Sequence, residues 1–95
     1  MNIQSTIKAV VAGDARANEF FRTAIGAQRM ANWALRNASE EEAYNHNAHY
    51  QEDMRYVTRR VCRITGMSFA TAREALIAIA EDEMRRLGPL TLRRA

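Results

Sequence analysis

Apolar residues along this 95-residue chain recur at intervals of three and four, which is the spacing of one face of a helix. No segment alternates apolar and polar residues long enough to indicate a strand. The pattern breaks near Gly13, between residues 37 and 39, and at Gly66–Ser68. It therefore predicts an all-α, small four-helix domain over residues 1–89, with a short basic tail over residues 90–95. The apolar stripes predict one core that contains Phe21, Leu35, Met54, Val57, Val61, Ile64, Leu76 and Ile79.

Residues that begin and end helices stand at each break. The expected N-caps are Asp14, Ser39 and Ser68. Ser39 also forms a capping box with Glu42, three residues later. Gly66 suits the left-handed backbone that ends a helix, and Gly88-Pro89 stops the last one. We therefore expect helices from about residue 3 to 12, from 15 to 37, from 40 to Gly66, and from Ser68 to Gly88.

The second helical segment carries small residues on one stripe and large apolar residues elsewhere. Positions 17, 21, 24, 28, 31, 35 and 38 advance by four and three alternately, and most of these side chains are methyl groups, so a partner helix can approach closely. Phe20, Ile25 and Trp33 fall outside that stripe. Two apolar faces exceed what one small core covers. We therefore expect the chain to self-associate, with a homodimer as the commonest arrangement.

The composition excludes several classes of function. The chain has a net charge of +3, and 13 of its 14 basic side chains are Arg. No run of 18 apolar residues is present, which predicts no membrane span, and the lone Cys62 predicts no disulfide framework and a cytoplasmic protein. The sequence shows neither a Ser/His/Asp or Cys/His pattern nor a glycine-rich phosphate loop. We therefore expect no enzyme and no cofactor.

The third helical segment ends in a row of arginines. Residues 54–73 hold five Arg and no acidic residue, and Arg55, Arg59 and Arg63 lie at i, i+4 and i+8 on one helical face. Such a row suits phosphate contacts, which give an affinity for nucleic acid that falls with salt. Cations near the end of a helix also interact favourably with its dipole without any ligand. A solvated helix surface is therefore the alternative interpretation.

The turn between the third and fourth segments has a distinctive sequence. Residues 61–76 read VCRITGMSFATAREAL, in which a small residue at Cys62 allows the two helices to cross closely. This string resembles the helix-turn-helix of bacterial regulators of the GntR and LacI types. The resemblance implies a small phage or bacterial regulator whose last helix meets the major groove of duplex DNA, which places Ser68, Phe69, Thr71 and Arg73 near DNA. The alternative is a turn that only caps a helix.

A helical interaction module without nucleic-acid function is the second interpretation of the whole chain. Examples are a phage- or plasmid-encoded inhibitor or adaptor that binds a host protein. The middle of the third segment is rich in amide, imidazole and phenol groups, and tyrosine is favoured at recognition surfaces. The candidate partner-binding residues are Tyr44, His46, Asn47 and Tyr50. His46 and His49 stand one turn apart but lack the glutamate of a His-Glu-x-x-His site, and we expect no metal.

Overall fold

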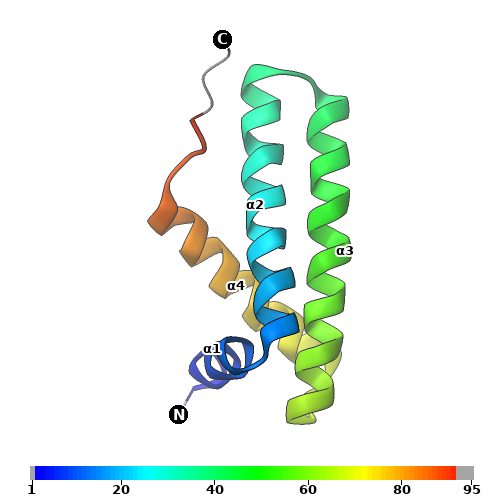
Figure 1. Cartoon of the computed structure of the whole chain (residues 1–95), viewed down its shortest axis with the longest axis vertical. Coiled ribbons are helices and arrows are strands. Elements are labelled where there is room, and N and C mark those ends of the chain that lie inside the picture. Colours follow the sequence, from blue (N-terminus) through cyan, green and yellow to red (C-terminus); the bar gives the residue numbers. More distant parts are fainter. Residues whose placement is uncertain (1, 92–95) are drawn as a thin grey trace.

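Four helices joined by short connections make up the fold (Figure 1). The structure is a computed structural model that describes residues 2–91. Helix α1 spans Ile3–Gly13, α2 spans Ala15–Asn37, α3 spans Glu40–Thr65 and α4 spans Phe69–Leu87; no strand occurs within residues 2–91. The predicted all-α, four-helix class is confirmed. The predicted basic tail includes Arg93 and Arg94, which lie outside the described residues.

The predicted N-caps at residues 14, 39 and 68 are all formed. The Asp14 side chain accepts a hydrogen bond from the Ala17 N–H at 2.9 Å, and the Ser39 side chain accepts one from the Glu42 N–H at 3.1 Å. Gly66 ends α3 with a φ of 76°, a left-handed conformation that other residues adopt only with strain. Local side-chain chemistry therefore places the breaks where the sequence predicts them.

Helices α2 and α3 run antiparallel and side by side as a long hairpin (Figure 1). Helices α1 and α4 pack against the half of the hairpin that lies nearer the N-terminus, and α4 crosses it obliquely. The molecule measures 45 × 23 × 21 Å, so the hairpin defines its long axis. Since α3 is the most extensive neighbour of α2, the alanine stripe of α2 packs within the chain. We call the two parts of the hairpin the covered half and the open half.

The main core fills the covered half, where all four helices meet. Six of the eight predicted core residues belong to it. The Phe20 and Tyr56 rings pack beside it, with centroids 4.3 Å apart. Its buried members are Ile7, Val11, Ala17, Phe21, Ala24, Ile25, Tyr50, Met54, Val57, Val61, Ala72, Ala75, Leu76, Ile79 and Ala80.

The core prediction is wrong for Leu35 and Ile64. Leu35 is 63% exposed and Ile64 is 50% exposed. Each stands in the last turn of its helix, where no neighbouring helix covers it. A repeating pattern indicates the direction in which a side chain points, but it does not indicate how far the neighbouring helix extends.

A second, smaller apolar cluster lies in the open half of the hairpin. Trp33, Ala34 and Ala43 are buried there, and Met30 and Leu90 pack against them while remaining partly exposed. We call this group the Trp33 cluster. Leu90 reaches the Trp33 cluster because the chain after α4 turns and runs beside α2, towards the end of that helix (Figure 1). The segment predicted as a tail thus begins with a packed residue.

One ion pair fastens the corner between α1 and α2 to α3. The Asp14 carboxylate, which caps α2, also accepts a hydrogen bond from Arg60 Nε at 2.6 Å. The hydrogen bonds from Arg60 and from the Ala17 N–H lower the pKa of Asp14 from 3.8 to about 2. The ionised form of Asp14 therefore favours the folded chain.

We expect acid to weaken the fold through Asp14. A carboxyl group whose pKa is lower in the folded state stabilises the fold above its unfolded pKa, and this contribution is lost as the pH falls through the folded pKa. The melting temperature should therefore decline as the pH falls from 3.8 to about 2. Asp14→Asn keeps the N-cap but not the charge, and its decline over that range should be smaller. Thermal melts at a series of pH values measure both, and equal declines would contradict the prediction.

Candidate nucleic-acid interface

The arginine row lies on a face of α3 that is open to solvent. Arg55, Arg59 and Arg63 are exposed, and their side chains form no hydrogen bond or ion pair with another residue of the described range. Successive members are four residues apart, or about 6 Å along the helix axis at about 1.5 Å per residue. The row therefore presents three uncommitted guanidinium groups over about 12 Å.

Residues on either side of the row limit the extent of its free positive charge. Arg60 follows Arg59 directly, but one residue turns about 100° around a helix, and Arg60 reaches Asp14 instead. Glu52 is exposed and precedes Arg55 by three positions, which places the two on the same side of α3. Positive charge thus concentrates in the last three turns of α3.

The turn at Gly66–Ser68 is closed by the side chains beside it. The Thr65 hydroxyl donates to a backbone carbonyl one turn earlier at 2.7 Å and accepts from the Met67 N–H at 3.1 Å. Ser68 Oγ accepts from the Thr71 N–H at 3.2 Å and donates to Thr71 Oγ1 at 2.8 Å. The hydroxyl groups of Ser68 and Thr71, which were expected near DNA, are therefore engaged in capping α4.

The start of α4 presents little free positive charge. Arg73 is half-buried, and its Nη2 donates to Gln51 Oε1 on α3 at 3.0 Å. Phe69 is 43% exposed, and Glu74 and Glu81 are exposed further along α4. The candidate DNA-binding residues thus divide into a free row on α3 and a group on α4 that is largely occupied in intramolecular contacts.

The four candidate partner-binding residues are separated by the fold. Tyr44 is 74% exposed, whereas Tyr50 is 8% exposed and belongs to the main core. Asn47 Nδ2 donates to Gln28 Oε1 on α2 at 2.8 Å, and His46 is half-buried. Of these four side chains, Tyr44 is the one that projects into solvent with no partner in the described range.

Sequence reasoning missed the neighbour of Tyr44. Leu35 and Tyr44 line an open groove of about 330 Å³ between α2 and α3, with Ala31 and Ala43 also lining it. The position of Leu35 within three residues of the end of α2 is the signal that could have indicated exposure. The groove lies in the open half of the hairpin.

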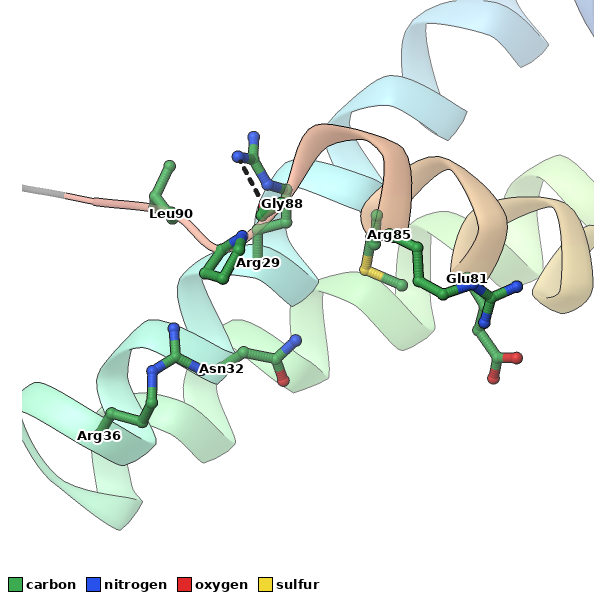
Figure 2. A pocket seen from close by; sticks show the side chains of 9 residues that line it. Arg29, Asn32, Arg36, Glu81, Arg85, Gly88 and Leu90 are labelled. Atoms are coloured by element: carbon green, nitrogen blue, oxygen red, sulfur yellow. Dashed lines mark hydrogen bonds between the residues drawn. The ribbon is translucent and has the colours of Figure 1, made fainter.

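A pocket of about 480 Å³ between α2 and the end of α4 also contains arginines (Figure 2). Arg36 and Arg85 lie on opposite sides of it in this view, and Arg85 pairs with Asp82 on its own helix. Arg29 donates to the Gly88 carbonyl. Arg29 and Arg85 are already engaged within the chain, so the pocket offers less uncommitted positive charge than the row on α3.

Comparison with known proteins gives no further direction, because the chain matches no protein-family model, no curated protein and no solved structure. Among residues 2–91, no helix has the length and apolar character that crossing a membrane requires. The same residues contain no group of three His, Cys, Asp or Glu side chains placed to hold a metal ion. The candidate interface therefore depends on the geometry and charge of α3.

Arg59 and Arg60 are adjacent in the sequence but differ in their contacts. Arg60 pairs with Asp14, whereas Arg59 is exposed, so substituting each in turn compares a structural side chain with an uncommitted one. We expect Arg60→Ala to lower the melting temperature, because it removes the partner of Asp14. Arg59→Ala should leave the melting temperature unchanged, since surface substitutions away from specific contacts are nearly neutral. Thermal melts of the two variants at neutral pH measure the difference. A lower melting temperature for Arg59→Ala would show that the row belongs to the fold and is not free to bind.

Proposed function

We propose that this protein binds duplex DNA through the phosphate backbone, with Arg55, Arg59 and Arg63 as the principal contacts. The observation that carries this proposal is the row of exposed, uncommitted guanidinium groups on one face of α3. A guanidinium group matches phosphate oxygens in a two-pronged hydrogen-bonding geometry. Phosphate contacts position a protein on DNA without reading its sequence. Binding of this kind is therefore largely independent of sequence.

The proposal gives α4 a smaller part than a helix-turn-helix regulator gives its second helix. A base contact by Arg73 requires this side chain to leave Gln51. Ser68 and Thr71 can reach DNA only at the expense of the cap that begins α4. Phe69 is exposed and can contact a thymine methyl group. Sequence preference, where present, is thus expected to be modest.

We expect DNA binding to weaken with salt in proportion to the number of row arginines. Each phosphate contact contributes about 0.9 to the slope of log affinity against log salt concentration. Arg55→Ala, Arg59→Ala and Arg63→Ala should each reduce the slope by about 0.9 and weaken binding to all sequences alike. Titrations of a labelled random duplex at several salt concentrations measure the slope.

Arg22→Ala is the matched control, because Arg22 is exposed on α2 and lies outside the row. This variant should keep the wild-type slope, and Arg59→Lys should nearly keep it because the charge remains. If the wild-type protein shows no salt-dependent binding at low ionic strength, the proposal fails. Equal losses of slope in Arg22→Ala and Arg59→Ala would show that the row is not the DNA-binding surface.

A second candidate function is protein interaction through the open half of the hairpin. The observation in its favour is that Leu35 and Tyr44 are both largely exposed beside one groove. Monomeric proteins seldom group large apolar side chains on the surface without a binding role.

For this second candidate, we expect Leu35→Ser combined with Tyr44→Ser to abolish capture of a specific partner from a host lysate. Arg59→Ala should retain that capture, because it alters a different surface. Affinity purification followed by mass spectrometry measures both. Partner capture that survives the double substitution but not Arg59→Ala would instead assign the interaction to α3.

We also propose self-association of the chain as a homodimer. The two apolar faces of α2 that motivated it are covered within the chain, one by α3 and the other by the core and by Leu90. Self-association would therefore have to use a surface other than these two faces.

A further inference from the structure

A cleft of about 720 Å³ lies between α2 and α4 in the covered half of the molecule. One face of α2, over residues 18–29, and one face of α4, over residues 79–87, form its walls, and Lys8 reaches it from α1. In Figure 1, α4 leads away from α2 towards its own C-terminal end. Arg29 bridges the two helices there, because its Nη2 donates to the Gly88 carbonyl at 3.1 Å (Figure 2). We call this hollow the α2–α4 cleft.

The floor of the α2–α4 cleft is apolar. Phe21, Ile25 and Ile79 line it, and each is a member of the main core that keeps a small exposed area. Leu87 lies at the rim and is 43% exposed. A smaller hollow of about 160 Å³ shares Phe21 and Ile79 with the cleft and continues to Leu76. The apolar surface therefore extends from the rim inwards between three helices.

The charged side chains around the cleft are mainly basic. Lys8, Arg22, Arg29 and Arg86 line it against the one carboxylate of Glu83, which gives a formal balance of +3. Glu83 is already engaged, because Arg86 pairs with it through both Nη2 and Nε. Among the described residues that line the cleft, no carboxylate is left to neutralise the remaining cations.

Arg22 is the basic side chain of the cleft that is most available to a ligand. It is exposed and forms no hydrogen bond or ion pair with another residue of the described range. Arg29 is engaged with a backbone carbonyl at the end of α4. The hydrogen bonds from Arg86 lower the pKa of Glu83, and the charge of Lys8 adds to this effect, so Lys8 lies close to that carboxylate. A free guanidinium group can hold a carboxylate through two parallel hydrogen bonds.

The rim also contains a glycine that the fold does not require. Gly26 lies within α2, one turn after Arg22, and is exposed. A Cβ atom at this position would meet nothing within 4 Å, and the backbone is helical. Glycine inside a helix is less favourable than alanine. Neither close packing nor backbone conformation explains Gly26, whereas the absence of a side chain leaves the cleft open beside Arg22.

We infer that the α2–α4 cleft is a binding site for a small amphipathic carboxylate. Arg22 receives the carboxylate, and the apolar body of the ligand lies over the floor of the cleft. The volume falls within the range of about 300–1,000 Å³ that is typical of small-molecule sites. A neutral apolar ligand leaves the cations unpaired, and a small inorganic anion leaves the floor uncovered. No residue of the arginine row lines the cleft, so this inference does not depend on DNA binding.

Octanoate is the probe for the test, and it is titrated into the isotope-labelled chain while the backbone amide signals are followed by NMR. We expect saturable shifts in the lining segments of α1, α2 and α4 and much smaller ones along α3, which contributes no lining residue. Octylammonium at the same ionic strength has an apolar chain of the same kind with the opposite charge, and it should give no saturable shift. Acetate should bind at least about 100-fold more weakly, because each buried methylene strengthens binding about fourfold.

Arg22→Ala should weaken octanoate binding about fivefold, since it removes an exposed ion pair with the carboxylate. Arg16→Ala is the matched control, because Arg16 is an exposed arginine on the same helix that does not line the cleft. This control loses the same charge and should bind octanoate as the wild type does. Equal losses in the two variants would show that net charge, and not a site at Arg22, governs binding.

Gly26→Leu tests the cleft without changing any charge. A side chain at position 26 of a helix leans towards the preceding turn, and therefore towards Arg22. The variant should weaken octanoate binding at least about tenfold, and its melting temperature should not fall, because leucine favours a helix more than glycine does. Ala48→Leu adds the same side chain at an exposed position of α3 and should bind octanoate normally.

Three results would overturn the inference. The first is an absence of saturable shifts with octanoate, or shifts concentrated on α3. The second is equal binding of octylammonium or acetate at the same residues, because the cleft would then not recognise a ligand with both parts. The third is wild-type octanoate affinity in Gly26→Leu at an unchanged melting temperature. If Gly26→Leu does unfold more easily, the comparison of Arg22→Ala with Arg16→Ala decides.

Discussion

The constraint on which the rest of the structure depends is a difference in length between the hairpin and the helices that cover it. Helices α2 and α3 contain 23 and 26 residues, or about 35 and 39 Å at about 1.5 Å per residue. Helix α1 contains 11 residues, and α4, with 19, crosses the hairpin at an angle. Four-helix packing is therefore confined to one half. In the other half α2 packs on α3 through alanines, and Leu90 packs against the Trp33 cluster.

The same packing decides which polar side chains remain available for binding. In the covered half, Arg60 pairs with Asp14, and Arg73 donates a hydrogen bond to Gln51. Arg59 points away from these neighbours because it lies about 100° around α3 from Arg60. Two adjacent arginines thus differ in their contacts: Arg60 pairs with Asp14, whereas Arg59 is exposed and pairs with no residue of the described range. Exposure on α3 follows from the way this helix faces α1, α2 and α4.

Local signals in the sequence predict local structure well, and the errors concern contacts between distant residues. Asp14, Ser39 and Gly66 are identifiable from residue type and position, because a cap needs only neighbours along the chain. Leu35 is exposed where the apolar stripe predicts burial, and Tyr50, a candidate partner-binding residue, is buried in the main core, since burial depends on how the other helices pack. The pairing of Arg60 with Asp14, which are 46 residues apart, has no local signature. For the candidate interface, the spacing of Arg55, Arg59 and Arg63 predicts the shared face correctly, but the bond from Arg73 to Gln51 could not be foreseen.

The two proposed surfaces lie in different halves of the molecule, and this separation has a physical consequence. The arginine row occupies the part of α3 that leads to Gly66, whereas the groove beside Leu35 and Tyr44 lies towards the connection between α2 and α3. A partner that occupied the groove would therefore leave the arginine row exposed. The two proposed functions therefore do not exclude each other, since occupation of one surface would leave the other accessible.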